Sequence, residues 1–397
     1  MIETTSTAKN FLGLPTAQFL HEYWQKKPLL IRQAFPNYQA PLTPEDLAGL
    51  ACEESVLSRL VTHDRKKDQW LLRTGPFAEE EFPKLGKKDW TLLVQDMDKW
   101  DVDVRALLTH FRFLPAWRVD DVMISFAAPG GSVGPHVDQY DVFLLQAQGS
   151  RRWQIDTDPA APCGFRADVE LKLLQKFSPS HEWRLEPGDM LYLPPGLPHH
   201  GEAIDACMTF SIGMRAPSQA ELIVDLAEEL AAALPDEARY SDPDLQAPDD
   251  PFEIDGAAMS RVDAALAALQ QMSAAQKAEW FGRFITRYRS SGEISAAPKT
   301  PSFATVEKSL ADGGQLLRHP FTRTAWACNG KRAQLFINGD TFAMGLASAR
   351  ILASHDSLDQ AAFAKLDNDA RNVLKTLLQR GLYQLQRQLQ RPRKAHR

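Results

Sequence analysis

The sequence predicts an α+β protein with an antiparallel sandwich or barrel at its centre, followed by a helical region. Three observations lead to this fold class. Residues 121–155 and 183–214 consist of short β-rich runs that glycine and proline turns separate. The sequence places no helical stretch between consecutive runs, so the crossovers that a parallel sheet needs are missing. From residue 216 the apolar residues recur with helical spacing instead.

The first hundred residues are expected to mix helices and strands. Phe19–Phe35 is typical of a short helix leading into a strand at Leu29–Arg32. A second helix is expected over Thr43–Leu50, because a threonine N-cap is followed by proline at the first helical position and by aspartate three residues after the cap. Trp90–Trp100 is expected to be helical, with Asp101–Phe111 continuing the helix.

Helical spacing organises the region after the β-rich runs. Ser218 and Glu221 form a capping-box pattern at the start of 216–234, where leucines recur at every fourth position. Two further helices are expected over 257–271 and 274–288. The leucine stripe has to be buried, and the sequence leaves a partner helix and packing within the chain equally open.

The last hundred residues resemble a winged-helix module. Residues 235–251, with four prolines and six acidic residues, are typical of a linker or a long loop, and a second linker is expected over 290–301. Short strands are expected at Ala333–Ile337 and Thr341–Met344, joined by an Asn-Gly-Asp turn. The two helices expected after them are Leu358–Leu366 and Ala370–Leu385.

Composition describes an ordinary protein with sizeable hydrophobic cores. Of the 397 residues, 44% are hydrophobic and 24% charged, and no apolar run approaches the ~18 residues of a membrane-spanning helix. An early Glu3 without a following apolar stretch argues against a secretion signal, so a cytoplasmic protein without a membrane partner is expected. The cysteines are too far apart for a zinc ribbon or a disulfide scaffold: Cys52, Cys163, Cys207 and Cys328.

The net charge of −6 hides an asymmetry along the chain. Residues 301–397 hold 15 Lys and Arg against 7 Asp and Glu, so their net charge is +8 and that of the remaining chain is −14. An acidic body attracts basic partners, and a basic end attracts nucleic acid such as ribosomal RNA. Charge alone leaves solvated surfaces without a partner equally open.

One group of residues has the composition of a metal site. His136 and Asp138 follow a glycine-proline turn at positions i and i+2, so both side chains share one face of an extended segment. His199 and His200 follow 61 residues after Asp138, and adjacent strand residues face opposite ways, so only one of them can join the pair. Two histidines and one carboxylate form the facial triad that Fe(II) oxygenases use, whereas catalytic zinc usually keeps a single open position.

These motifs resemble a known enzyme family. The segments GPHVDQYDVFLLQAQGSRRWQI and EPGDMLYLPPGLPHHGEA are similar to the JmjC-type, cupin-fold oxygenases that depend on 2-oxoglutarate and Fe(II). Within that family the chain resembles the bacterial ribosomal oxygenases, which hydroxylate an arginine of large-subunit ribosomal protein sixteen. Their likeness extends to YWQKKPLLIRQAF and FRFLPAWRVDDVMISFAAPGGSVGPH. The resemblance covers roughly residues 19 to 217 and implies a double-stranded β-helix barrel, Fe(II), and 2-oxoglutarate and O₂ as co-substrates.

The resemblance also implies which residues bind the metal. His136, Asp138 and His199 occupy the positions of the iron ligands. His199 is preferred to His200 because the family's ligand directly follows a proline, here Pro198.

Three further residues take their expected roles from the family. Arg151 lies where relatives have a lysine or arginine for the distal carboxylate of 2-oxoglutarate, and a guanidinium suits that carboxylate. Ser125 occupies the position of a hydroxyl that binds the same group. Thr209 stands where relatives often have asparagine, so its expected contribution is a single hydrogen bond.

The substrate side of the site is less specific in the sequence. Tyr140 shares a face with His136 and Asp138. The sequence leaves two roles for it equally open, a residue that lines a substrate channel and an ordinary tyrosine of a sheet. Asp120 and Asp121 are expected to be solvated charges at the start of a strand rather than contacts to a substrate cation.

The expected organisation has three parts: a JmjC catalytic domain over 1–217 with its core at about 92–217, a helical dimerisation region over 218–297 that makes a homodimer, and a winged-helix-like domain over 298–397. The expected function is hydroxylation of a ribosomal-protein arginine. Two alternatives stay open at this point. One is a JmjC-type histidyl hydroxylase or demethylase acting on another protein, and the other is a non-enzymatic cupin module that binds nucleic acid.

Overall fold

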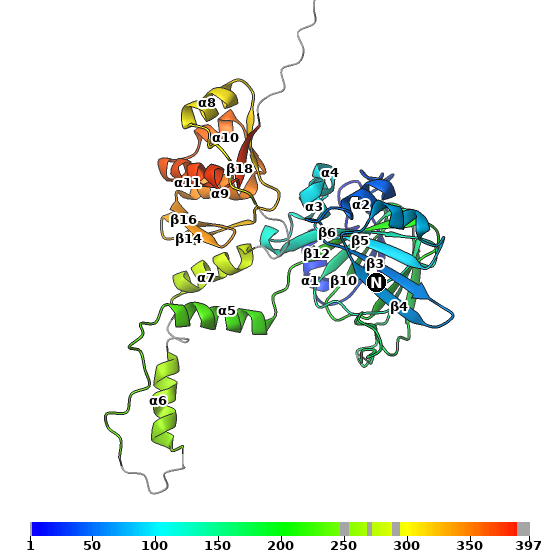
Figure 1. Cartoon of the computed structure of the whole chain (residues 1–397), viewed down its shortest axis with the longest axis horizontal. Helices are drawn as coiled ribbons and strands as arrows, with labels where there is room; N and C mark the ends of the chain where they lie inside the picture. Colours follow the sequence, from blue (N-terminus) through cyan, green and yellow to red (C-terminus); the bar gives the residue numbers. More distant parts are fainter. Residues whose placement is uncertain (1, 163, 247–253, 268–271, 288–293, 387–397) are drawn as a thin grey trace, which may run out of the picture. The chain divides into compact units, whose positions relative to one another are not determined.

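The structure is a computed structural model of the chain, and it divides into two compact units, the first reaching to Ala216 and the second beginning at Pro217 (Figure 1). Within its described residues, the longest and most apolar helices fall short of what crossing a membrane requires. The residues that the structure describes are 2–162, 164–246, 254–267, 272–287 and 294–386.

Two sheets form the first unit and confirm the predicted sandwich or barrel. The larger sheet has the strand order β1-β2-β10-β7-β12-β6-β5-β3-β4, and the smaller has the order β11-β8-β9. Neighbouring strands are antiparallel except for β1 and β2. The strands are β1 (Glu3–Thr5), β2 (Leu29–Arg32), β3 (Ser58–Asp64), β4 (Gln69–Thr74), β5 (Trp90–Val94), β6 (Val119–Ala127), β7 (Val142–Gln148), β8 (Arg151–Ile155), β9 (His181–Leu185), β10 (Met190–Leu193), β11 (His199–Ala203) and β12 (Cys207–Met214).

Each face of the larger sheet packs against a different layer. In β7, Val142 and Leu144 join a core with Trp153 of the smaller sheet. Their neighbours Phe143 and Leu145 point to the opposite face, where the N-terminal helices cover them. Side chains on the face of Val142 and Leu144 therefore point into the space between the two sheets. Residues at alternate strand positions share this face, and these are the ones that can line the site.

The helices of the first unit are short. The short helix expected within Phe19–Phe35 is present but begins earlier, at Thr16. The helix expected over Thr43–Leu50 is confirmed, and Thr43 and Asp46 form a reciprocal capping box. The helices are α1 (Thr16–Glu22), α2 (Pro44–Leu50), α3 (Met97–Trp100) and α4 (Val102–Leu107), with 3-10 turns η1 (Glu79–Lys84), η2 (Leu108–Phe111) and η3 (Ala116–Arg118).

The expectation of a helix over Trp90–Trp100 is wrong. Trp90–Val94 is the strand β5, which pairs with β3 on one side and β6 on the other, as the adjacent ribbons in Figure 1 show. Leu92 and Val94 are buried toward the helices, while Thr91 and Leu93 face the space between the sheets. Because both faces are covered, Thr91 is the single polar residue of the run, and no alternation distinguishes a strand from a helix.

The second unit begins with α5 (Gln219–Ala232), α6 (Gly256–Leu266) and α7 (Ala274–Thr286). The capping box of Ser218 and Glu221 is confirmed at the start of α5. Asp225 of α5 accepts a hydrogen bond from Trp280 Nε1 of α7 at 2.9 Å. No side chain of α5 is fully buried. Leu222, Leu226 and Leu230 of the leucine stripe are half-buried, and Leu234, which follows the helix, is exposed, so packing within the described part of the chain covers the stripe only in part.

A hydrophobic core with two small sheets completes the second unit. The predicted strand pair at 333–337 and 341–344 is confirmed as a hairpin. The expected helix over Ala370–Leu385 is too long: it ends at Gln379, Gly381 adopts a positive φ of 76°, and the chain then returns as a strand beside β13. The elements are α8 (Phe303–Ala311), β13 (Gln315–Arg318), β14 (Thr324–Asn329), β15 (Arg332–Ile337), β16 (Asp340–Met344), α9 (Leu346–Ser354), β17 (Ser357–Leu358), α10 (Gln360–Ala364), α11 (Asn368–Gln379) and β18 (Tyr383–Gln386).

Candidate functional site

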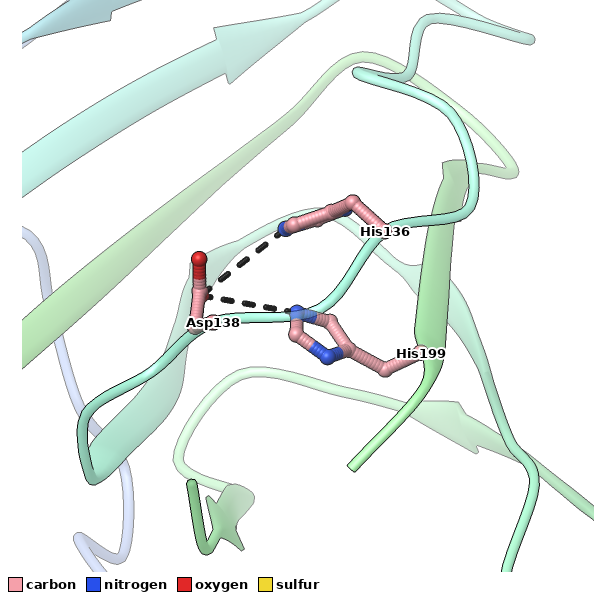
Figure 2. A group of neighbouring side chains, drawn as sticks. All are labelled: His136, Asp138 and His199. Carbon is pink, nitrogen blue, oxygen red and sulfur yellow. Dashed lines mark ion pairs between the residues drawn. The ribbon is translucent and has the colours of Figure 1, made fainter. Parts of the chain in front are cut away.

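Three side chains that the sequence singled out converge in the first unit. His136 and Asp138 come from the loop between β6 and β7, and His199 begins β11 (Figure 2). The Nε2 atoms of His136 and His199 lie 3.8 and 3.7 Å from Asp138 Oδ2, and the three potential ligand atoms all lie within 4.8 Å of one another. Two main-chain hydrogen bonds of 3.0 Å between His136 and His199 hold the loop against the strand.

The main chain orients both imidazoles. His136 Nδ1 lies 2.9 Å from the carbonyl oxygen of Gly134, and His199 Nδ1 lies 2.9 Å from that of Leu197. A carbonyl only accepts, so each Nδ1 carries the proton and each Nε2 presents a lone pair toward Asp138. Burial, with His136 adding to it, lowers the pKa of His199 to about 4, which keeps that ring neutral and able to ligate at neutral pH. This donor set fits a divalent metal with one open face.

His200 points elsewhere, as the opposite faces of a strand require. Its Nε2 lies 3.0 Å from Ser132 Oγ, and its ring packs edge-on against Phe177. Burial lowers the pKa of His200 to about 4. The structure thus separates the two adjacent histidines: His199 joins the cluster, and His200 joins a buried hydrogen-bond network beside it.

A cavity of about 500 Å³ opens beside the three side chains. Arg151 lines it from β8 and is 3% exposed, yet no carboxylate within the described residues pairs with it. Its Nη2 donates to the carbonyl oxygen of Gly201 at 3.1 Å, while Nε and Nη1 have no hydrogen-bond partner in the described chain. Burial lowers the pKa of this guanidinium, but arginine stays protonated in proteins. A buried cation with two unused donors fits the distal carboxylate of a dicarboxylic acid.

Further hydroxyl and ring donors line the same cavity. Ser125 Oγ lies 3.5 Å from the carbonyl oxygen of Thr209, so it holds only a weak hydrogen bond. The hydroxyl of Thr209 donates to Gln146 Oε1 at 3.1 Å. Thr91 Oγ1 and Trp153 Nε1 are buried and have no partner within the described residues. These donors, on strands of both sheets, give the cavity a polar lining suited to an anionic ligand.

Acidic and phenolic groups form another part of the cavity lining. Asp120, Asp121 and Tyr140 all line it, and Tyr140 is 41% exposed. Burial, with Asp96 adding to it, raises the pKa of Asp121 to about 7. Burial and the carboxylate of Asp138 raise the pKa of Tyr140, so its phenol keeps a proton that it can donate. This part of the cavity suits a cationic hydrogen-bond donor.

Sequence reasoning missed some of these residues. Asp121 was expected to be a solvated charge, but the register of β6 turns it to the same face as Ser125. Thr91 was hidden by the wrong helix assignment for β5. Arg59 of β3 also lines the cavity, and its segment carries no motif. Strand parity counted back from Ser125 would have found Asp121, whereas Thr91 and Arg59 come from strands that only the tertiary fold brings to the site.

Comparison with known proteins agrees with the fold. Residues 106–222 match the JmjC domain, and residues 268–384 match the ROXA-like winged helix. The chain is 39% identical over 309 residues to the ribosomal protein uL16 3-hydroxylase of Escherichia coli (strain K12), which spans 77% of this chain and 81% of that protein. It is 39% identical over 228 residues to a probable ribosomal oxygenase of Haemophilus influenzae, across 57% of this chain and 54% of that protein.

Solved structures of a ribosomal oxygenase from Escherichia coli share the whole architecture. One has a TM-score of 0.84 at 33% identity, covering 94% of this chain and 99% of the other. Another, in complex with cobalt and 2-oxoglutarate, has a TM-score of 0.79 at 32% identity over the same shares. This chain thus combines a JmjC domain with a following winged helix, and these solved structures share its fold. With this combination and with 39% identity over most of its length, the chain belongs to the JmjC-domain ribosomal oxygenases.

Proposed function

We propose that the chain is a 2-oxoglutarate- and Fe(II)-dependent oxygenase that hydroxylates an arginine side chain of large-subunit ribosomal protein sixteen, uL16, while 2-oxoglutarate becomes succinate and CO₂. The observation that carries the proposal is one cavity that combines the cluster of His136, Asp138 and His199 with a buried, unpaired Arg151. The relative from Escherichia coli supplies the choice of substrate, since its name gives uL16.

His136, Asp138 and His199 are the proposed iron ligands. When bound, the iron supplies the oxidative chemistry that inserts one oxygen atom of O₂ into a C–H bond. The protein side of this task is to hold three ligands on one face, so that the opposite face stays open toward the cavity. The two carbonyl-bound Nδ1–H groups fix the imidazole tautomers that this arrangement needs.

Arg151 and Ser125 are the proposed anchors of 2-oxoglutarate. The guanidinium has N–H donors free at Nε and Nη1 within the described residues. The Ser125 hydroxyl, which holds only a weak hydrogen bond, lines the same cavity from β6. Thr209 contributes a hydrogen bond once its hydroxyl turns from Gln146 to the ligand. Trp153 also lines the cavity beside Arg151, with its ring centre 5.1 Å from the guanidinium carbon.

Tyr140 is the proposed substrate contact, with Asp121 beside it. A guanidinium is a planar cation with five N–H donors, and a carboxylate is its best acceptor in proteins. Burial raises the pKa of Asp121 and so disfavours its charged form. A bound cation stabilises that charged form, so Asp121 and a substrate guanidinium favour each other. The net charge of −14 on residues 1–300 supports a basic protein partner as well.

Mass spectrometry of ribosomal proteins tests the proposal. The purified chain is incubated with bacterial large-subunit proteins, Fe(II), 2-oxoglutarate and O₂, with a His136→Ala variant as control. The expected result is one added oxygen on an arginine of uL16 that the variant does not produce. Succinate release without that product would contradict the substrate, and the absence of 2-oxoglutarate turnover would contradict the oxygenase.

The same assay separates the alternatives. A relative from Aedes aegypti, 27% identical over 210 residues, is named as a bifunctional lysine-specific demethylase and histidyl-hydroxylase. Oxygen added to a histidine, or loss of a methyl group from a lysine, would favour that chemistry. A chain that binds nucleic acid equally well as His136→Ala and turns over no 2-oxoglutarate would be the non-enzymatic cupin module.

We also propose that the three-part organisation includes a homodimer, with 1–217 as the catalytic domain, 218–297 as the dimerisation region and 298–397 as the winged-helix-like domain. Exposed apolar side chains on α5 support it, because Ile223 is 67% and Val224 55% exposed. Light scattering after size exclusion is expected to give twice 44.4 kDa for the wild type. Ile223→Glu is expected to give the monomer mass, and a monomeric wild type would contradict the proposal.

The proposed place of action is the cytoplasm, and a contact to ribosomal RNA is proposed for the basic tail. Residues 387–397 lie outside the described residues and hold five of the 15 basic residues counted from Pro301, but no acidic one. Removing them is expected to reduce the salt-dependent affinity for ribosomal RNA. Unchanged affinity would contradict this contact and leave the oxygenase proposal intact.

A further inference from the structure

A buried hydroxyl lies between the proposed metal ligands and the proposed 2-oxoglutarate anchor. Ser132, in the loop after β6, is 5% exposed. Its Oγ accepts a hydrogen bond from the main-chain N–H of Gly134 at 2.9 Å and lies 2.7 Å from the carbonyl oxygen of Gly201. His200 Nε2 lies 3.0 Å from the same oxygen. One hydroxyl therefore meets three groups from two segments.

The roles within this network follow from the number of hydrogen atoms available. A hydroxyl donates once and accepts twice, and a carbonyl only accepts. The proton of Ser132 therefore goes to Gly201, and both lone pairs are left for Gly134 N–H and His200. His200 must then carry its proton on Nε2 and donate. All three hydrogen-bonding positions of Ser132 are filled, which leaves the side chain one orientation.

Each bond leads directly to a residue of the proposed site. Gly134, which donates to Ser132 through its N–H, also accepts from His136 Nδ1 through its carbonyl oxygen at 2.9 Å. Gly201, which accepts from Ser132, also accepts from Arg151 Nη2 at 3.1 Å. One hydrogen bond thus joins Ser132 to Gly134, which anchors a metal-ligand imidazole, and another joins it to Gly201, which anchors the guanidinium.

The surroundings leave Arg151 little freedom to compensate for a shift of this network. A Cβ atom at Gly201 would lie 2.7 Å from Arg151 Nε and from the Trp153 ring, so the guanidinium packs directly on the main chain of β11. The loop is fastened to the same strand by Gly130 N–H to Ala203 O at 2.8 Å and Ala203 N–H to Gly131 O at 3.0 Å. Those main-chain bonds hold the first residues of the loop. The bond from Ser132 to Gly201 holds the next part of the loop, beside the site.

We propose that Ser132 is a positioning residue that couples the metal-ligand loop to the 2-oxoglutarate anchor, with His200 as the third member of its network. The proposal rests on the proposed function. Loss of the hydroxyl leaves Gly134 N–H and His200 Nε2 without an acceptor and removes one of the two donors to Gly201. His136 and Arg151 then lose the fixed positions of their carbonyl partners together.

Two dissociation constants test the coupling. Cobalt(II) is titrated into the metal-free full-length chain by its absorption spectrum, and 2-oxoglutarate is titrated by calorimetry into the cobalt-saturated chain. In Ser132→Ala, the Kd for cobalt is expected to rise by roughly 10-fold to 100-fold, the usual range for residues that orient metal ligands. The Kd for 2-oxoglutarate is expected to rise by about tenfold, since the Arg151 anchor loses its fixed position. Ser132→Thr keeps the hydroxyl and is expected to restore both.

Ser58→Ala is the matched control. Ser58 is a 2% exposed serine of the same unit whose hydroxyl donates to the carbonyl oxygen of Ala51, and it does not line the cavity. Its thermal unfolding temperature is expected to fall as in Ser132→Ala, with both dissociation constants unchanged. If Ser58→Ala and Ser132→Ala changed the two dissociation constants equally, Ser132 would only stabilise the fold, and the proposal would be overturned.

The remaining outcomes are equally decisive. A change in only one of the two constants contradicts the coupling. His200→Phe keeps an aromatic ring and leaves Ser132 in place, so both Kd values are expected to rise by a smaller factor. This variant tests the network if Ser132→Ala does not fold. A wild-type chain that binds neither cobalt nor 2-oxoglutarate contradicts the proposed function itself, whereas wild-type binding that Ser132→Ala retains contradicts only this inference.

Discussion

Arg151 of the first unit is held differently from the paired arginines of the second unit. In the first unit, Arg151 is almost completely buried, and its Nη2 donates to the carbonyl oxygen of Gly201 rather than to a carboxylate. In the second unit, arginines at or near the surface stand beside acidic partners. These pairs are Arg318 with Asp356, Arg332 with Asp369 and Arg380 with Asp340.

The difference separates a binding role from a structural one. Taking a charge out of water costs several kcal/mol unless a partner compensates for it, so a fold gains nothing from an unpaired buried guanidinium. A ligand that brings its own carboxylate supplies the missing compensation. A paired arginine near the surface needs no ligand and stabilises only the segments that it connects. Replacing an arginine of each kind is therefore expected to have a different effect on stability and on co-substrate binding.

Replacing Arg151 by methionine is expected to have the largest effect. Two charge-assisted hydrogen bonds to 2-oxoglutarate are lost, at ~1.5–3 kcal/mol each, so the KM for 2-oxoglutarate rises by about 100-fold or more. The ligand-free chain is expected to gain stability, by ~1–2 kcal/mol in the free energy of unfolding, because a buried unpaired charge is removed. Succinate assays and thermal melts without ligand measure the two effects. A destabilised ligand-free chain would remove the distinction between the two kinds of arginine.

Replacing Arg318 by methionine is expected to act in the opposite direction. Its guanidinium is 14% exposed and donates to Ala353 O at 2.9 Å, to Thr324 Oγ1 at 3.0 Å and to Asp356. The variant loses these hydrogen bonds, one of them to the carboxylate of Asp356, from a guanidinium that is mostly buried, so the free energy of unfolding of the second unit falls by ~2 kcal/mol. The KM for 2-oxoglutarate stays at the wild-type value. A changed KM in this variant would show that the second unit takes part in binding the co-substrate.

Asp121→Asn is expected to remove a pH dependence. With a pKa of about 7, the carboxylate is about nine-tenths charged at pH 8 and about one-tenth charged at pH 6. Protonation removes the charge that attracts the substrate guanidinium, so wild-type kcat/KM for a uL16 peptide falls by up to about tenfold between pH 8 and pH 6. The asparagine variant starts near the low value and stays there. Parallel profiles for the two proteins would assign the dependence to another group.

The sequence predicted the site better where its residues lie close together in the chain. The i, i+2 spacing of His136 and Asp138 specifies a shared face in any extended segment, and the structure has them on one side of the loop. Arg151 follows on β8 within the same continuous run. The helix starts at Thr43 and Ser218 were also predictable, because a cap is a contact between residues three positions apart.

Residues brought to the cavity from distant strands were not predictable in this way. Thr91 reaches it because β5 lies between β3 and β6, and the apolar run that forms β5 has no alternation to reveal its faces. Ser132 lies in a segment that resembles the family, but its role was not predictable from the segment, since it depends on the carbonyl of Gly201, which lies 69 residues away. Local rules identify local pairs, and the wall of the cavity is made by pairing between strands.

Arg332→Gln is expected to have the smallest effect, and it tests the other end of the comparison. Arg332 and Asp369 have side chains that are 55% and 53% exposed, so water and salt screen their attraction. The change in the free energy of unfolding is expected to lie within ~0.5 kcal/mol and to shrink further at high salt. Chemical denaturation at low and high salt measures it. A cost close to that of Arg318→Met would show that acidic partners, rather than burial and main-chain acceptors, decide how much an arginine contributes to the second unit.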